Sequence, residues 1–462
     1  MIAALVLAAL TATASAHHAV STTSAAAQAA FDRGLFLLYA YNGEAAYDAF
    51  GRALQADPHL AMAVWGQAIA SGSDLNTGMT PGRFTRAHEA AERAAGLTAY
   101  ASPEERAYID AAARRYAGTW GDRSADADRY FASMAQLAQT YPHDDDALLF
   151  QAEALMEARI DDGQARALIV RVLARNPSQP FANHLCIHSF DYAADHAPEL
   201  ACADRIAAWR LDPAAVHLAH MPAHAYILAG RYDRALKVSE SAWQLRQSAD
   251  APVKYAAHDA YTGWSVAMMR GDLETALLWA QRTGSAYGGS DIWATWARFE
   301  QWDRITGQPA PHEFFAALAL GLADLHRGDG AGAATMLRAY KDADADYRWL
   351  LEAAIDERTG QDGAAVTALN RALAYQKRED TGEQLPLFPA GEALGAFYYA
   401  RGRYENAAQA YESTIARFPN DPRALYGLAL SQSALGQAVT AAQTMKAFRH
   451  VWNAATLPHL GL

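Results

Sequence analysis

The residues best suited to chemistry lie in VHLAHMPAHAYILAGRY, residues 216–232, which contains His217, His220 and His224. A helix turns by about 100° per residue, so these three imidazoles would lie within about 60° of one another on one face. Neutral imidazole is the commonest protein ligand for zinc and copper, and three imidazoles make a metal site that keeps an open coordination position. The spacing therefore predicts a metal-binding face.

Pro222 interrupts this stretch. A proline inside a helix removes a backbone hydrogen bond and costs about 3 kcal/mol. Either a helix begins near Met221 and leaves His217 and His220 on the preceding turn, or one helix continues with a kink. Departures from local sequence rules are typical of functional sites, so the proline is compatible with a metal-binding role.

A second set of ligand-type side chains lies upstream, in ANHLCIHSFD, residues 182–191. His184, His188 and Asp191 are spaced i, i+4 and i+7, which places them on one helical face. His188 also falls at a usual packing position of a helical repeat. The segment is predicted to add two imidazoles and a carboxylate to the metal site.

His258 belongs to the segment that follows, KYAAHDAYTGWSVAMMRG. It stands thirteen residues before Gly271, just as His217 stands thirteen residues before Gly230. Equal distances from a turn place two side chains at the same level of consecutive repeats. Asp259, beside His258, suits either metal binding or the capping of a helix start.

The histidines and Asp191 form one predicted ligand set, which consists of His184, His188, Asp191, His217, His220, His224 and His258. Such a set can hold one or two metal ions. The affinity order of transition metals favours copper or zinc, and mixed imidazole and carboxylate ligands also suit iron or manganese. Glu153 and Glu157, in FQAEALMEAR, are predicted to hydrogen-bond a ligand or to act as a catalytic base.

Two other interpretations of the clustered histidines stay open. They could be surface residues without a common role, or they could line a groove that contacts a peptide or an anion. Histidines that stand alone are expected to be solvated or ordinary core residues; these are His59, His88, His143, His312, His326, His450 and His459.

Glycines that recur at a regular spacing indicate which helices position these side chains. Gly402 ends one apolar helix, and Gly436 stands in the equivalent place 34 residues later. Two amphipathic helices joined by a tight turn bury their apolar faces only by stacking on neighbours. The sequence therefore predicts an all-α superhelix of stacked helix-turn-helix hairpins. Further turns are predicted at Gly230, Gly271, Gly328 and Gly360.

This pattern resembles the tetratricopeptide repeat, through Leu394, Tyr398, Gly402, Tyr404, Ala407, Tyr411 and Pro419. Between about residues 25 and 280 the chain is also similar to a group of bacterial, often exported tetratricopeptide-repeat proteins. The segments that carry this likeness include FDRGLFLLYAYNGEA, ANHLCIHSFD and HLAHMPAHAYILAGRY. The resemblance implies one histidine constellation in the concave groove. Similar proteins carry Glu where Asp191 stands, which keeps a carboxylate there.

Four regions are predicted along the chain. Residues 1–16, MIAALVLAALTATASA, form a signal peptide, because a short apolar run precedes small residues, although no Lys or Arg precedes that run. Residues 17–280 form a helical-repeat region with the histidines, residues 281–387 form irregular repeats, and residues 388–462 form a tetratricopeptide pair. The protein is thus expected to be periplasmic or secreted. Cleavage would leave His17 at the N-terminus, where its amine and ring could chelate copper, with His18 beside it.

Cys186 and Cys202 are the two cysteines of the chain. Cys186 lies about 160–200° around the helix from His184 and His188, so it points away from the proposed metal. A disulfide is the favoured interpretation in an oxidising compartment. Two buried thiols, or cysteine ligation of a metal, are the alternatives.

Composition excludes several functional classes. The net charge of −12, without clusters of Lys and Arg, argues against nucleic-acid binding. No later stretch reaches the roughly 20 apolar residues of a membrane span. Phosphate-binding loops, serine-hydrolase elbows, His-Glu-x-x-His and dinucleotide fingerprints are also absent from the sequence.

We therefore expect a metal-dependent enzyme, an oxidoreductase or a hydrolase, that acts on a small molecule or a peptide in the groove. Trp264, Tyr226 or Tyr261 would supply an apolar wall. The alternative is a non-catalytic repeat scaffold that binds a partner peptide or protein, with a structural metal or none. A groove rich in Arg, Lys and Asn would mark the scaffold, whereas the inferred groove is rich in His.

Overall fold

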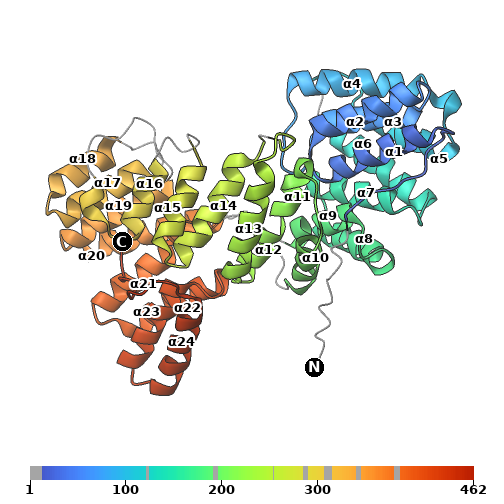
Figure 1. Ribbon diagram of the computed structural model, residues 1–462. Coiled ribbons are helices and arrows are strands. Elements are labelled where there is room, and N and C mark those ends of the chain that lie inside the picture. The colour runs from blue at the N-terminus through green and yellow to red at the C-terminus, as the bar shows by residue number, and fades with distance from the viewer. Residues whose placement is uncertain are drawn as a thin grey trace, which may run out of the picture. The chain divides into compact units, whose positions relative to one another are not determined.

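The fold is described by a computed structural model, which covers residues 13–120, 124–190, 196–252, 254–284, 290–305, 315–339, 345–378 and 385–462. Throughout these ranges the chain forms helices, with isolated β-bridges at two places (Figure 1). Most of the predicted signal peptide lies outside the described residues. Among the described helices, none has both the length and the apolar character needed to cross a membrane.

The chain divides into two compact units. Unit 1 consists of residues 1–222 and 244–252, and unit 2 consists of residues 223–243 and 253–462. Each unit is built from helical hairpins, so the predicted all-α fold of stacked hairpins is confirmed. The three predicted repeat regions within residues 17–462 stay a prediction, because they concern the type of repeat.

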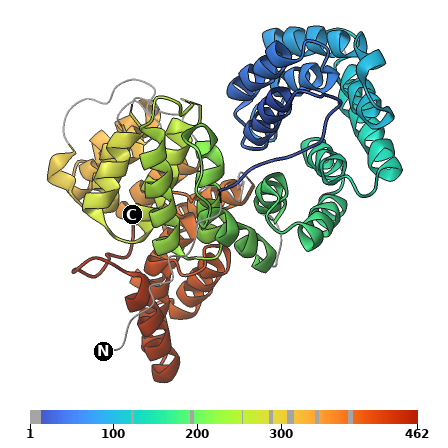
Figure 2. The same cartoon turned by 45° about the vertical axis from the view of Figure 1, so that its right-hand side comes forward.

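Unit 1 begins with a series of antiparallel neighbours, coloured blue to green in Figures 1 and 2. Its helices are α1 (Ala25–Tyr39), α2 (Gly43–Ala56), α3 (Ala61–Ser71), α4 (Pro81–Ala95), α5 (Pro103–Arg115), α6 (Ser124–Thr140), α7 (Asp145–Glu157), α8 (Asp162–Arg175), α9 (Pro180–Phe190), α10 (Ala197–Ala207) and α11 (Val216–His220). Side-chain caps define the starts of several of these helices, such as α1, α2 and α4. Ser102, for example, forms a capping box with Glu105 at α5.

Unit 2 continues the same construction. It holds most or all of α12 (Pro222–Leu228), α13 (Tyr232–Arg246), α14 (Ala256–Met269), α15 (Leu273–Arg282), α16 (Ser290–Arg298), α17 (Ala316–His326), α18 (Gly330–Ala339), α19 (Ala345–Arg358), α20 (Asp362–Arg378), α21 (Ala390–Ala400), α22 (Tyr404–Arg417), α23 (Pro422–Ala434) and α24 (Ala438–Val451). Trp264, Trp279, Phe315 and Leu350 belong to its large apolar core.

The predicted turn glycines all adopt the left-handed conformation that ends a helix. Residues with a Cβ atom rarely adopt these φ values, whereas glycine adopts them freely. A glycine at the end of a helix therefore allows a tight turn, after which the next helix runs in the opposite direction. The φ values lie between 63° and 83° at Gly230, Gly271, Gly328, Gly360, Gly402 and Gly436.

One large ring fills the space left by glycines on two neighbouring helices. A Cβ atom on Gly34 of α1 would lie 2.7 Å from the ring of Phe50 in α2, and one on Gly66 of α3 would lie 2.6 Å from it. Real Cβ atoms do not approach so closely, so the absence of side chains lets α1, α2 and α3 pack tightly. The same arrangement recurs in unit 2 at Tyr411, between Gly395 and Gly427.

Aromatic contacts hold α9 against its neighbours. The ring centroids of Phe181 in α9 and Phe150 in α7 are 5.4 Å apart, and Phe181 stacks on Tyr39 of α1 at 4.8 Å. Such pairs contribute about 0.5–1.5 kcal/mol beyond the burial of area. They fix α9 beside the end of α1.

A disulfide joins Cys186 of α9 to Cys202 of α10. The predicted pairing is confirmed, and the two alternatives for these cysteines, buried thiols and metal ligands, are wrong. The bond closes the hairpin on the side of α9 that does not carry the histidines.

The substitution Gly66→Ala should lower the free energy of unfolding of unit 1 by about 1–3 kcal/mol, because the added methyl group overpacks Phe50. Urea unfolding monitored by circular dichroism measures this loss. Gly82→Ala in α4 is the matched control, since a Cβ there meets nothing within 4 Å. Equal stabilities of the two variants would show that the ring and the glycines are not tightly packed.

Candidate metal centre

The predicted three-histidine helix is divided at Pro222. Helix α11 ends at His220, Met221 forms a turn, and α12 begins at Pro222. A proline at the first helical position loses no hydrogen bond, since that N–H has no partner within the helix. His217 therefore precedes the break and His224 follows it. A helix begins next to Met221, as the first of the two predicted arrangements has it, but His217 and His220 lie on a short helix of their own and not on a turn.

Three buried histidines of unit 1 converge. His184 and His188 come from α9, and His217 comes from α11. Each offers one ring nitrogen, and these three atoms lie within 4.8 Å of one another. Their ring centroids are 5.0 Å, 5.1 Å and 6.4 Å apart, and no ring is more than 8% exposed. The i, i+4 spacing on α9 thus has the predicted effect, and His217 completes a group of three.

Backbone and amide groups orient two of these rings. Nδ1 of His184 lies 2.6 Å from the backbone carbonyl oxygen of Tyr39, so it carries a proton and donates it. This leaves Nε2 of His184 as the nitrogen that can bind a metal. The side-chain amide of Asn76 lies 3.3 Å from Nε2 of His217.

The turn after α1 connects these histidines to the rest of unit 1. The ring of Tyr41 lies 4.4 Å from that of His184 and 5.8 Å from that of His217. Tyr41 has a φ of 53°, which is uncommon for a tyrosine and typical of functional sites. Asn42, next in the chain, donates a buried hydrogen bond of 2.8 Å to the carbonyl oxygen of Ala214, just before α11.

Tyr41 also links the histidines to a buried carboxyl group. Its hydroxyl donates to Oε1 of Glu153 at 3.0 Å. Burial raises the pKa of Glu153 to about 8; the charge of Arg115 opposes this shift and that of Glu157 reinforces it. A carboxyl group that titrates near neutral pH can both give and accept a proton, as a catalytic acid or base must.

The second predicted carboxylate, Glu157, is placed differently. Its Oε2 forms an ion pair of 2.6 Å with Nη2 of Arg115, which also donates to Ser73 at 3.2 Å. Glu157 therefore holds Arg115, whereas Glu153 contacts the tyrosine beside the histidines.

The remaining predicted ligands are spread over both units. His220 is buried in unit 1, with its ring centroid 6.5 Å from that of His217. In unit 2 the Nε2 atoms of His224 and His258 lie 3.3 Å apart. Asp259 is buried, but Tyr255 is the N-cap of α14, so the alternative of a capping role for Asp259 is wrong. Asp191 lies outside the described residues.

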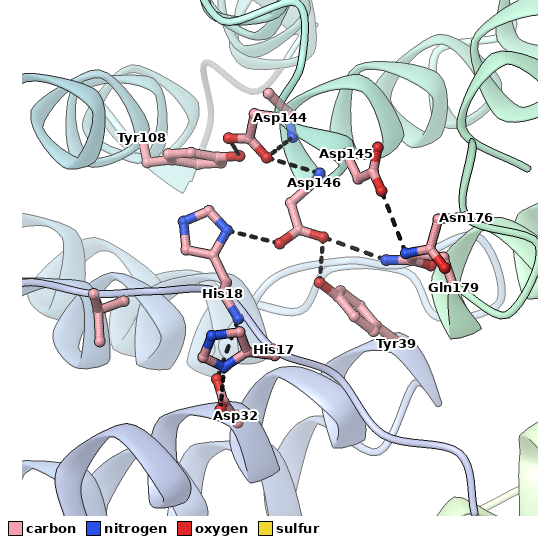
Figure 3. A network of polar contacts seen from close by, with 12 residues as sticks. His17, His18, Asp32, Tyr39, Tyr108, Asp144, Asp145, Asp146, Asn176 and Gln179 are labelled. Carbon is pink, nitrogen blue, oxygen red and sulfur yellow. Dashed lines mark hydrogen bonds and ion pairs between the residues drawn. The ribbon is translucent and has the colours of Figure 1, made fainter. Parts of the chain in front are cut away.

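Another group of ligand-type side chains, His18, Asp144 and Asp146, lies at the start of α7 (Figure 3). Nδ1 of His18 is 2.8 Å from Oδ2 of Asp146, and Tyr39 donates a hydrogen bond to the other oxygen of that carboxylate. Asp144 accepts a hydrogen bond of 2.5 Å from Tyr108. Because hydroxyls and an imidazole already occupy these oxygens, the group is better suited to an internal ion pair than to a metal.

The ion pair determines the protonation of His18. Burial alone lowers the pKa of His18, but the hydrogen bond and charge of Asp146, with the charges of Asp144 and Glu104, raise it to about 9. The imidazole is thus protonated at neutral pH. Nδ1 of the adjacent His17 lies 2.7 Å from Asp32, and its predicted role in copper chelation stays a prediction.

The substitution His18→Gln should lower the free energy of unfolding by about 1.5–3 kcal/mol at pH 6, because it removes a charge-assisted hydrogen bond. The folded-state pKa lies above the unfolded value of 6.5, so this stabilisation is complete below pH 6.5 and is lost as the pH rises through 9. Urea unfolding at pH values from 6 to 10 tests this. His59→Gln, at an exposed position, is the control. A difference from the wild type that does not change with pH would contradict the ion pair.

Comparison with protein families identifies one repeat. Residues 389–431, which include α21, α22 and part of α23, match the model described as tetratricopeptide repeat. This segment of the chain is similar to a tetratricopeptide repeat. This repeat lies in the predicted C-terminal pair, at residues 388–462. A comparison of the repeat protein with curated sequences gives no match.

Solved structures of helical proteins are similar to this repeat protein at low identity. The crystal structure of the MamA protein is 18% identical, with a TM-score of 0.24, and the match covers 44% of this chain and 99% of that chain. The Cut9–Hcn1 hetero-tetramer structure is 12% identical, with a TM-score of 0.42 and coverages of 93% and 80%. The human IFIT1 dimer with m7Gppp-AAAA is 12% identical, with a TM-score of 0.36 and coverages of 92% and 91%. None of these likenesses bears on function.

Proposed function

We propose that this repeat protein is a metal-dependent enzyme whose metal is held by His184, His188 and His217. The observation that supports the proposal is the approach of one ring nitrogen from each buried histidine to within 4.8 Å of the others. Three protein ligands leave a coordination position for a substrate. Imidazole ligands suit copper and zinc best, and iron or manganese next. A bound metal would supply Lewis-acid or redox chemistry to a small molecule or peptide.

The side chains around the histidines supply proton chemistry and orientation. Glu153, with its pKa raised to about 8 mainly by burial, can hold or release a proton at its carboxyl group. Tyr41 lies between that carboxyl group and the imidazoles and positions both. The hydrogen bond from His184 to the carbonyl oxygen of Tyr39 fixes which ring nitrogen faces the metal.

We further propose that the protein works in the periplasm or outside the cell. The disulfide between Cys186 and Cys202 supports this, because such bonds persist in oxidising compartments. The proposal is tested by the molecular mass of the protein recovered from the periplasm or the medium, and by whether Cys186 and Cys202 are joined by a disulfide in that protein.

Elemental analysis by inductively coupled plasma mass spectrometry tests the metal site. The protein is purified without a histidine tag, beside the triple variant His184→Ala/His188→Ala/His217→Ala. We expect about one equivalent of a single transition metal in the wild type and less than about a fifth of that in the variant, since three of the four ligands are gone. The double variant His59→Ala/His450→Ala, at exposed positions, should keep the metal.

Two results would contradict the proposal. One is a wild type that holds no metal after reconstitution with copper, zinc, iron or manganese. The other concerns catalysis, which needs an accessible coordination position. After cobalt substitution, azide should change the visible absorption of the metal centre, and an unchanged spectrum would indicate a closed structural site.

A groove in unit 2 favours a second candidate function, partner-peptide binding. A cavity of about 220 Å³ lies between α20, α21 and α22, beside the matched repeat. Its apolar wall includes Leu373, Leu394 and Tyr398, and its polar groups include Asn406 and Lys377. This mixture of apolar and amide groups suits an extended peptide.

The groove is tested by selection of binding peptides from a display library. We expect peptides with micromolar affinity for the wild type and at least tenfold weaker binding to Ala410→Arg, which fills the groove. Ser433→Arg, at an exposed position of α23, is the control. If the peptides bound Ala410→Arg and Ser433→Arg with equal affinity, their binding site would not be this groove.

A further inference from the structure

A second cavity of unit 2 combines arginines with aromatic walls. Its volume is about 110 Å³, and its lining includes Arg298, Phe299, Trp302, Phe388, Arg423 and Trp452. By the same kind of measure, one water molecule needs about 10–15 Å³, so the cavity has room for a small organic molecule. None of these residues belongs to the histidine site or to the peptide groove.

Each of the two arginines of this cavity has one buried nitrogen without an acceptor among the described residues, and for Arg298 this nitrogen is Nε. Each arginine is 8% exposed. Arg298 donates a hydrogen bond of 2.7 Å from Nη2 to Glu392, and its Nη1 forms an ion pair of 2.7 Å with the other oxygen of that carboxylate. Arg423 donates from Nη2 to the backbone carbonyl oxygen of Arg298 at 2.8 Å, but its Nη1 has no hydrogen-bond acceptor among the described residues. An unsatisfied donor on a buried cation is costly, and an anion would relieve that cost.

Three carboxyl groups lie near Arg423, and two of them are engaged by other side chains. Burial and the charge of Glu392 raise the pKa of Asp421 well above its usual range, which weakens this group as a partner for Arg423. Burial opposes ionisation of Glu392, but Arg298 holds the pKa of Glu392 below its usual value, and these two groups cancel. Glu300 pairs with His459 at 2.9 Å.

The surroundings of Arg423 also indicate the kind of anion. Its guanidinium carbon lies 5.9 Å from the ring centroid of Phe299 and 5.6 Å from that of Trp452. The guanidinium carbon of Arg298 lies 5.7 Å from the ring centroid of Phe388. Aromatic walls favour an ion with an apolar part over a fully hydrated one such as phosphate. The single unpaired nitrogen of Arg423 fits one carboxylate group.

We propose that this cavity binds a small organic monocarboxylate, whose oxygens accept hydrogen bonds from Arg423 and whose apolar part lies against the aromatic rings. A carboxylate offers two acceptors in the plane that a guanidinium recognises. The proposal is independent of the metal centre, because the two sites lie in different units.

Propionate is the probe for this site, studied with the full-length protein at constant ionic strength. Saturation-transfer difference NMR should detect its methyl group in the presence of the wild type. Scanning fluorimetry should show a rise in Tm of about 1–3 °C at saturating propionate, because the ligand binds the folded state. Propionamide, which has the same shape without the charge, and chloride should have no such effect.

Two variants locate the binding. Arg423→Met removes the charge and keeps the length of the side chain. Ala454→Phe fills the cavity and leaves both arginines in place. Both should lose the NMR signal and the rise in Tm. Arg449→Met, at an exposed position of α24, should keep both.

The results distinguish site binding from a general salt effect. Loss of the response in Ala454→Phe, with circular dichroism like that of the wild type, supports the proposal even if Arg423→Met fails to fold. An unchanged response in Ala454→Phe would overturn it. A response of equal size to propionamide or chloride would also overturn it.

Discussion

The close approach of neighbouring helices is the constraint on which the rest of the structure depends. Phe50 can lie between α1 and α3 because Gly34 and Gly66 present no side chain to it. Tyr411 has the same position between Gly395 and Gly427. Helices at this spacing transmit small displacements to one another, since close-packed interiors leave little free volume.

The fold could be predicted from the sequence because its signals are local. A left-handed glycine ends a helix whatever surrounds it, and Gly230, Gly402 and Gly436 all stand at such turns. The pairing of Cys186 with Cys202 was likewise accessible, since both lie on one short hairpin. Helical spacing also brings His184 and His188 to one face of α9 without reference to any other element.

The arrangement of the site could be predicted only in part. Equal distances from turn glycines suggested one constellation, but Pro222 begins a new helix, and the chain divides between units at that point. His217 thus joins the histidines of α9, whereas His224 lies near His258. The spacing of histidines along the sequence does not show where one compact unit ends and the next begins. Pro222 was the one signal in the sequence that α11 ends there.

Other residues of the site gave no signal in the sequence. Asn76 and Tyr41 reach the histidines from turns that only the packing of α1, α3 and α9 brings near. His18 was considered only as the neighbour of His17, whereas the structure pairs it with Asp146, more than a hundred positions away along the chain. Contacts of this kind depend on tertiary structure and have no periodic pattern.

The turn between α1 and α2 has a consequence for how such a chain can diverge. Within four residues it supplies the carbonyl oxygen that orients His184, the hydroxyl that meets Glu153, and the amide that holds the segment before α11. Surface turns ordinarily accept insertions and deletions. Here we expect the gain or loss of one residue to break all three hydrogen bonds at once, and with them the contacts to α7, α9 and the segment before α11. The length of this turn is therefore a marker by which related chains that retain the centre can be told from those that retain only the fold.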